Sequence, residues 1–580
     1  SYDVPQWQLN SLAKGSSITK LVAEAKSGLK PGKVEQFVRL LWEEPFDRGT
    51  KKKWNYLQNG GEYAPYFYST YLVVFYEKDW KQLKLVPSSR ITGVEDYFKC
   101  GITYGKRTDY IYGYPMPAGQ IFSNEGMAVF PKQLDKYWTT LSLINSSSIQ
   151  TVMNRFAGQH KAHSYFNKIH LFTSSFPKEL AENAKKIVSI LYGLDRYVET
   201  STYFEAPPSL DNAKLVSLEQ INEWIVKTKD KIKEAEHLYR VNNKIASNCL
   251  SDGTDSEDKL PNWEYIIFRN SLNHSYVIKS ILSYSFGICI SAFQKKEFGK
   301  MNEFDPQIVL NELPEEHLLS NVRTKPPVIQ TIFEISTVSK SKNIQAFTTI
   351  LNEYAPVLVE FSQETLKQEL GYESIIEFFS KSQGFFDYHL NLYSRGRREA
   401  PIYWPLQTPS GSYTLWVYYH RINEQTLYTC VNDFIEPKLK AFREELSGLR
   451  NKSTRSSAEE KELVKLTDLE AELKDFRDEL LRLAKFWKPN LDDGVQITAA
   501  PLWKLFQHRQ WQKKLKETWE KLEDGEYDWA HIARSIWPER VLRKCYQDRS
   551  LAIAHDVEDD FWEEVEIPVK HKGKGKGEIK

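Results

Sequence analysis

One apolar repeat, between positions 435 and 487, constrains the fold more than any other part of the sequence. Apolar residues recur there in alternating steps of three and four, on both sides of a polar break at 451–457. They are Ile435, Leu439, Phe442, Leu446 and Leu449 before the break, and Leu466, Leu469, Leu473, Phe476, Leu480, Leu483 and Trp487 after it. This spacing is the a/d pattern of a coiled-coil seam, and Pro437 lies where a first helical turn tolerates proline. The sequence predicts an antiparallel helical hairpin, either a projecting docking arm or spacer, or a pair packed on a larger body.

The rest of the chain predicts mixed α/β (α+β) structure. Tyr71–Tyr76 is strongly β-prone, and Val34–Trp42 is also strand-like. We expect a short helix near Ile18–Lys26 and another over Lys132–Asn145, with glycines and prolines between these elements as turns. Leu218–Arg240 has apolar residues close to helical spacing. Short strands and helices therefore share the first half of the chain.

The length predicts several domains, because 580 residues exceed the ~250–300 at which a single core stops growing. We predict five parts. They are an N-terminal α/β domain over 1–210, a helical region over 211–330, a second sheet-containing lobe over 331–434, the coiled-coil hairpin over 435–490, and a helical C-terminal domain over 491–580. The last part ends in a basic Lys/Gly tail at 570–580, which either touches DNA phosphates or has no role.

Composition sets few limits on function. Lys and Arg number 78 against 77 Asp and Glu, so a nucleic-acid surface would need local clustering of basic residues. The many aromatic residues fit a core of large side chains, which we favour, or a stacking surface. Five scattered cysteines without a Cys-x-x-Cys pair predict free thiols in a reducing cytoplasm. We expect no membrane span and no signal peptide. Ser1 either follows a removed initiator methionine or is a cut point in a longer protein.

We predict neither a catalytic residue nor a metal site. An adenine-N6 methyltransferase that uses S-adenosylmethionine needs a Gly-rich cofactor turn and an Asn/Asp-Pro-Pro-Tyr/Phe loop around the flipped base. The two Pro-Pro pairs, Pro207-Pro208 and Pro326-Pro327, lack that context, and phosphate-loop and zinc-helix motifs are absent. His160 and His163 have no nearby third ligand, so we interpret them as surface histidines. The polar run 251–259 lacks the offsets of a calcium loop.

A compact polar run between glycines and aromatics is the best candidate for recognition. Lys106, Arg107, Thr108 and Asp109 follow Tyr104 and Gly105. Arginine fits a guanine edge or a phosphate, and glycines let the backbone approach closely. Arg107 thus reads a base, binds a phosphate, or is a surface residue paired with Asp109. We slightly favour base reading.

Ordered segments along nearly the whole chain resemble the target recognition and C-terminal region of large adenine-N6 DNA methyltransferases. These are the BREX and DISARM phage-defence enzymes and related single-chain restriction-modification enzymes. The segments, which we call the landmarks, are Gly28–Lys33 with Phe37–Trp42, Trp54 with Gly60–Tyr66, Gly101–Pro131 with 143–146, Glu199–Glu205, Arg398–Trp404, Tyr418–Arg421, Leu491–Val495, Tyr527–His531, Trp537–Arg540 and Ser550–His555. Pro31 departs from the family's usual Thr, which puts a contact there in doubt.

The resemblance implies sequence-specific binding of double-stranded DNA for adenine-N6 methylation in a bacterial defence system. It implies that the domain over 1–210 is a DNA target recognition domain and that the matching segments contain DNA-binding residues. They are Lys33, Arg39, Tyr104, Lys106, Arg107, Thr108 and Asp109. The catalytic domain would be fused upstream or be a partner subunit, and S-adenosylmethionine would bind there rather than to this chain. Other phage-defence proteins are further expected partners. The alternative is a non-catalytic scaffold subunit of a defence complex, which salt-dependent, sequence-selective DNA binding would distinguish.

Overall fold

The computed structural model describes residues 5–44, 53–76, 80–173, 175–210, 214–250, 263–269, 271–290, 332–336 and 342–562. Helices and short strands alternate along this part of the chain, which confirms the mixed α/β class. Buried apolar side chains form one connected cluster from Trp7 to Val557. The division into five parts stays a prediction.

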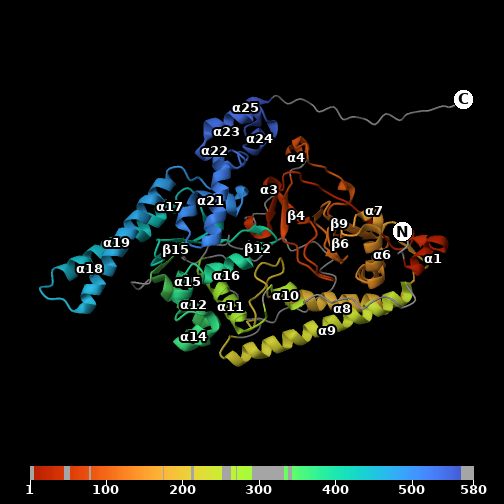
Figure 1. Ribbon diagram of the computed structural model, residues 1–580, viewed down its shortest axis with the longest axis horizontal. Coiled ribbons are helices and arrows are strands. Elements are labelled where there is room, and N and C mark those ends of the chain that lie inside the picture. Colours follow the sequence, from red (N-terminus) through yellow and green to blue (C-terminus); the bar gives the residue numbers. More distant parts are fainter. Residues whose placement is uncertain are drawn as a thin grey trace.

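Two four-stranded sheets form the centre of the N-terminal region (Figure 1). The first has the order β2-β9-β6-β7 and the second β3-β5-β4-β8. Their strands are β2 (Ala23–Lys26), β3 (Val38–Leu40), β4 (Trp54–Gln58), β5 (Leu72–Phe75), β6 (Gly101–Gly105), β7 (Tyr114–Met116), β8 (Ile121–Phe122) and β9 (Gly126–Pro131). Because β8 lies in one sheet and β9 in the other, residues 123–125 cross between the two sheets. The crossing is tight: a side chain on Gly126 would meet the Gly60 backbone at 2.3 Å.

Two of the expected short elements are only partly correct. The segment 18–26 contains α2 (Ile18–Leu21) and then strand β2, and 34–42 begins with the helical turn α3 (Val34–Phe37) before β3 and a 3-10 helix at Leu41–Glu43. Elements this short are set by tertiary contacts more than by local propensity. The prediction for Tyr71–Tyr76 is confirmed by β5, and that for 132–145 by a 3-10 turn and α5 (Tyr137–Ile144).

Long helices pack against the N-terminal sheets. α8 (Lys178–Asp195) and α9 (Leu218–Leu250) lie side by side beneath them in Figure 1. The predicted helix at 218–240 is confirmed and continues ten residues further to Leu250. The other helices up to residue 290 are α1 (Gln6–Lys14), α4 (Lys81–Leu85), α6 (Ser147–Ala157), α7 (His163–Phe166), α10 (Trp263–Phe268) and α11 (His274–Cys289). The remaining strands here, β1 (Ser16–Ser17) and β10 (His170–Leu171), pair with each other.

The next lobe surrounds a three-stranded antiparallel sheet, ordered β11-β15-β14. Its strands are β11 (Ile332–Ser336), β14 (Tyr403–Gln407) and β15 (Tyr413–Tyr418), and a separate two-stranded hairpin, β12 (Ser394–Arg395) with β13 (Arg398–Glu399), precedes β14 in the chain. Its helices are α12 (Lys342–Tyr354), α13 (Pro356–Val359), α14 (Gln363–Leu370), α15 (Ile375–Ser380) and α16 (Phe385–Leu392). Phe286 of α11 contacts the rings of Phe333, Phe385 and Trp416 in this lobe. These aromatics therefore build a core, as favoured from composition.

The helical hairpin projects to the left in Figure 1, where α18 (Glu436–Arg450) and α19 (Ser457–Ala484) lie side by side. Eleven of the twelve predicted seam residues are buried, and Leu449 is half-buried, so the predicted seam is confirmed. The helix does not begin at Pro437. It continues from α17 (Thr426–Thr429) through a π-helical turn at Cys430–Ile435. Proline cannot form the regular bond to the carbonyl four residues before it, and a π turn locally changes that pattern.

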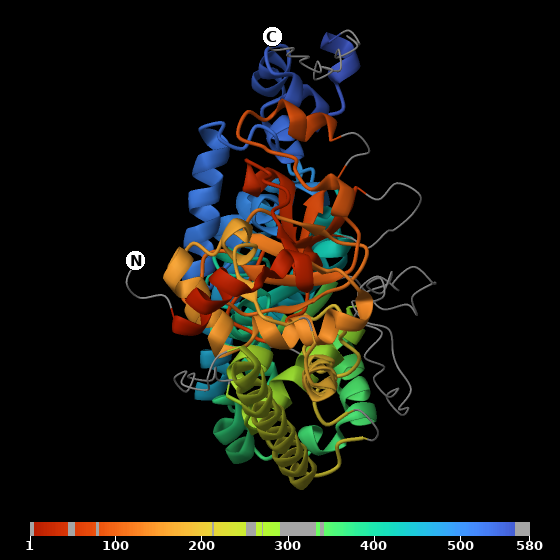
Figure 2. The same cartoon turned by 90° about the vertical axis from the view of Figure 1, so that its right-hand side faces the viewer.

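Short helices form the C-terminal part, as expected. They are α20 (Val495–Ala499), α21 (Arg509–Glu523), α22 (His531–Ile536), α23 (Pro538–Cys545), α24 (Arg549–Ala554) and α25 (Glu558–Phe561). α24 packs against α4 of the N-terminal region, where Gln82 Nε2 donates to the Ser550 carbonyl at 3.2 Å. Figure 2 shows this end of the molecule above the N-terminal sheets. The Lys/Gly tail and the run 251–259 lie outside the described residues. Within the described ranges, no helix has the length and apolarity that crossing a bilayer requires.

Candidate nucleic-acid interface

The turn that follows β6 exposes the predicted polar run. Arg107 has 67% of its side chain exposed, Asp109 is exposed, and Lys106 and Thr108 are half-buried. Arg107 also forms an isolated antiparallel bridge with His160. The structure therefore brings four of the seven predicted DNA-binding residues together on one surface turn.

Lys161 fixes this turn from behind. Its side chain is buried, and its ammonium group donates to the carbonyl oxygens of Thr108 (2.6 Å), Asp109 (3.1 Å) and Gly158 (2.7 Å). Burial lowers the pKa of Lys161 to about 8. Gln159 adds two contacts, since its carbonyl accepts from the Thr108 amide and its Nε2 donates to Asp109 Oδ1 at 2.8 Å. The backbone of the turn is thus held while its side chains face outward.

Glu125, rather than Asp109, is the partner of Arg107. Arg107 Nε lies 3.0 Å from Glu125 Oε2, and Lys106 Nζ lies 3.8 Å from Oε1 of the same carboxylate. The Lys106 amide also donates to the Glu125 carbonyl at 2.7 Å. Such a contact orients a guanidinium that still has other N–H groups to offer a ligand.

A second loop lies beside the crossing segment. Leu29 forms a parallel bridge with Ser123, and the Asn124 amide donates to the Leu29 carbonyl at 2.9 Å. Lys33, four residues after Leu29, is exposed. We define the recognition edge as 28–33, 59–61, 106–109 and 123–126. It contains five of the seven predicted residues.

The other two predicted DNA-binding residues are buried, which corrects those assignments. Tyr104 is fully buried in β6 and its ring packs against Phe166. Ile102 and Tyr104 alternate toward the core along β6, so the ring cannot reach a ligand on the surface.

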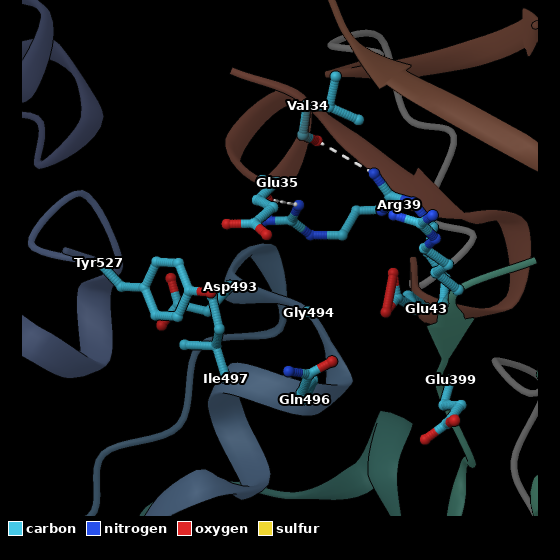
Figure 3. Close-up of a pocket in the computed structure, with 12 residues that line it drawn as sticks. Val34, Glu35, Arg39, Glu43, Glu399, Asp493, Gly494, Gln496, Ile497 and Tyr527 are labelled. Atoms are coloured by element: carbon cyan, nitrogen blue, oxygen red, sulfur yellow. Dashed lines mark hydrogen bonds between the residues drawn. The ribbon is translucent and has the colours of Figure 1, made fainter. Parts of the chain in front are cut away.

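Arg39 is 3% exposed and lies between the rings of Trp54 and Trp529, at 5.3 and 5.4 Å from their centroids. Its guanidinium donates to the carbonyls of Glu35 at 2.5 Å and Asp492 at 2.9 Å. Figure 3 shows Arg39 bonded to Glu35 at the wall of a cavity of about 330 Å³ that Asp493 and Tyr527 also line. Arg39 therefore connects the N- and C-terminal parts of the chain and does not lie on the exposed surface with the other predicted residues.

Several landmarks converge on this junction. Arg398 donates to the Val38 carbonyl at 2.7 Å, and Trp42 Nε1 donates to the Ala400 carbonyl at 3.0 Å. Tyr419 Oη donates to the Leu491 carbonyl at 2.9 Å. Asp493 accepts from the amides of His531 and Ile532. Burial lowers the pKa of His531, but its contact with Asp493 raises it, and the net shift is upward. These segments, from Val38 to Ile532, form one structural joint.

The landmark Glu199–Glu205 is likewise internal. Glu199 is buried and accepts hydrogen bonds from Tyr393 Oη (2.8 Å) and Ser283 Oγ (3.1 Å). Burial raises its pKa to about 7. Ser201 bonds to Asp195, whose pKa burial raises to about 6. This landmark joins the N-terminal region to α11 and α16.

Sequence reasoning missed three residues of the interface. Glu125 lies 16 positions after Asp109, and Lys161 lies 55 positions after Lys106, so no local sequence pattern indicates their contacts with the turn. Tyr110 is 49% exposed, and its ring lies 5.9 Å from that of Tyr63. It directly follows the predicted run, so its position was the available signal. His160 and His163 belong to no cluster of metal-binding side chains among the described residues.

No protein-family model matches the chain, and no curated protein matches it. The interface therefore stands on its own geometry: an exposed arginine, a half-buried lysine and one exposed carboxylate, on a turn with a fixed backbone. This arrangement suits hydrogen bonding to a polar, anionic surface.

Proposed function

We propose that this chain recognises a specific sequence in duplex DNA for adenine-N6 methylation within a bacterial phage-defence or restriction-modification system. Catalysis belongs to a methyltransferase domain or subunit that binds S-adenosylmethionine and flips the target adenine. The chain described here positions that catalytic part on its site.

One observation carries the proposal: an exposed arginine on a turn whose backbone is held by a buried lysine. Lys161 donates to three carbonyls behind the turn, while Arg107 is oriented by Glu125. A fixed donor loses little conformational entropy on binding, which favours specific contacts. An exposed arginine with no functional role would gain nothing from such support.

The side chains of the turn match the chemistry of a DNA groove. The Arg107 guanidinium fits the O6 and N7 acceptors of guanine, and Asp109 can accept from the cytosine amino group. The hydrogen bonds from Lys161 to the backbone carbonyls hold the turn, so Arg107 and Asp109 keep a fixed position relative to each other. The support from Glu125 orients the guanidinium, which suits a bidentate contact with the O6 and N7 atoms of a guanine.

The experiment is selection of duplexes from a random-sequence pool by the purified chain, followed by Arg107→Ala on the selected site. If Arg107 reads a base, the variant loses ~1–3 kcal/mol of affinity for the selected duplex and little for random duplex. A phosphate contact would instead weaken both equally and lower the salt slope by about one unit. Arg543→Ala, an exposed arginine on α23, is the matched control.

Equal binding of the Arg107 variant and wild type on both duplexes would remove Arg107 from the interface. Failure of the wild-type chain to enrich any sequence, with no salt-dependent binding, would overturn the proposed function. That second result would favour the scaffold role in a defence complex.

A further inference from the structure

Two cationic residues face each other directly across a backbone bridge beside the recognition edge. The Lys30 amide donates to the Arg90 carbonyl at 2.8 Å, and the Arg90 amide donates to the Lys30 carbonyl at 2.9 Å. A pair that exchanges both hydrogen bonds is directly opposed, with both side chains on the same face. Both residues are exposed.

This pairing is unfavourable in the isolated protein. Like charges directly opposite each other on neighbouring strands are destabilising. Neither Lys30 nor Arg90 has an acidic partner among the described residues, whereas nearby Lys26 and Lys99 share Asp96. Lys26 and Lys99 are therefore neutralised by Asp96, whereas Lys30 and Arg90 are exposed without a neutralising carboxylate in the described structure.

The backbone around the two cations is tightly held. Gly32, at φ +77°, packs against Ser88 and Ser89, where a side chain would meet backbone at 2.8 Å. Thr92 Oγ1 donates to the Gly28 carbonyl at 2.8 Å. Lys33, on the same loop, adds a third exposed cation without an acidic partner in the described structure. These contacts fix the repulsive arrangement rather than letting the loops move apart.

We propose that Lys30, Arg90 and Lys33 form a second DNA contact that binds the phosphate backbone irrespective of sequence. This inference rests on the proposed function and extends it beyond the turn at 106–109. A backbone polyanion would neutralise the opposed cations, since each contacted phosphate releases condensed counterions. We call these three residues the phosphate clamp.

Its position supports this assignment. Leu29, next to Lys30, pairs with Ser123, and Glu125 two residues later holds Arg107. The phosphate clamp and the turn thus both adjoin the crossing segment 123–125. In protein–DNA complexes, contacts with the phosphates fix the position of the protein on the duplex, so that the base-reading residues meet the correct bases. The cations lie on an exposed surface, which suits an extended duplex better than a small anion.

The test uses charge reversal, because it separates folding from binding. Arg90→Glu places a carboxylate opposite Lys30 and converts the repulsion into an ion pair. We expect the melting temperature at low salt to stay level or rise. Affinity for selected and random duplexes should fall alike, by tenfold or more, and the salt slope should drop by about one to two units. Lys231→Glu, on the exposed face of α9, is the matched control and should leave binding unchanged.

Unchanged duplex binding by Arg90→Glu would overturn the phosphate clamp while leaving sequence recognition intact. A lowered melting temperature would contradict the repulsion between Lys30 and Arg90. In that case Arg90→Gln tests the DNA contact, because removing one cation that contacts a phosphate must still lower the salt dependence of duplex binding. If wild type binds all duplexes without preference and Arg90→Glu abolishes that binding, the clamp stands and the proposed sequence recognition fails. If wild type and Arg90→Glu bind duplexes equally well and without sequence preference, both the phosphate clamp and the proposed sequence recognition are wrong.

Discussion

Glu199 lies among buried groups that connect three parts of the chain. Burial raises its pKa to about 7, against an ordinary value of 4.5, although Tyr393 and Ser283 donate to it. Below pH 4.5 both the folded and unfolded chains carry the proton. As pH rises from 4.5 to about 7 the unfolded chain loses its proton first, so this group lowers stability progressively. Above about pH 7 the destabilisation is complete.

Glu199→Gln should therefore flatten part of the pH dependence of stability. The amide oxygen can still accept from Tyr393 and Ser283, while the ionisation is removed. We expect the variant to match wild type near pH 4.5 and to exceed it by up to about 3 kcal/mol at pH 8. Thermal melting across this pH range measures the difference, and Glu219→Gln, on an exposed carboxylate of α9, is the control. A constant offset between Glu199→Gln and wild type at all pH values would refute the assignment.

Burial also explains which single residues could be identified from sequence. Arg107 and its neighbours were recognisable because they form a contiguous polar run between glycines. Arg39 alternates with Val38 and Leu40 along β3, so a local reading places it on an outer face. That face is covered by Asp492 and Trp529, more than 450 residues later. Local periodicity gives the face of a strand, but not what packs on it.

At the scale of elements, the helical hairpin was predictable because its pattern is local and repeated. Leu473 and Leu480 are fully buried in the seam between α18 and α19. Replacing both with Asp puts two carboxylates where no partner restores their lost hydration. We expect a loss of at least about 4 kcal/mol, since truncating a single buried Leu costs about 2–5 kcal/mol.

Circular dichroism and limited proteolysis should show a lower melting temperature and early cleavage between 436 and 484. Val464→Asp changes a 60% exposed residue of the same helix and should have little effect. Equal melting of Leu473→Asp/Leu480→Asp and Val464→Asp would exclude a buried seam. Loss of binding to a catalytic partner with DNA binding retained would support a docking role for the hairpin.

Short elements were harder to predict, for a physical reason. The segment 34–43 contains a helical turn, a three-residue strand and a 3-10 turn within ten residues. No periodic pattern can develop over such lengths, so contacts with Arg398, Ala400 and Asp492 determine the backbone. The same holds for the π turn before Pro437, which depends on a continuous helix that begins at Thr426.

At the scale of the whole molecule, two groups of landmarks occupy different places. Those at 28–33, 60–66 and 101–131 contribute to the recognition edge, whereas those at 398–404, 418–421, 491–495 and 527–531 build the joint around Arg39. The joint brings the C-terminal part against the N-terminal sheets.

The whole chain should transfer no methyl group on its own. The sequence has neither a Gly-rich cofactor turn nor an Asn-Pro-Pro-Tyr-like loop. Between the named strands of the described structure, β4–β8 is the one parallel pair, whereas a doubly wound cofactor fold presents its ligand at the carboxyl ends of parallel strands. Labelled S-adenosylmethionine with the selected duplex should leave the DNA unlabelled. Adding a candidate methyltransferase subunit should restore labelling on that duplex and not on one with the recognised sequence scrambled, and Arg107→Ala should reduce it. Labelling by the chain alone, at a level proportional to its concentration and unaffected by further purification, would show that catalysis resides in this chain.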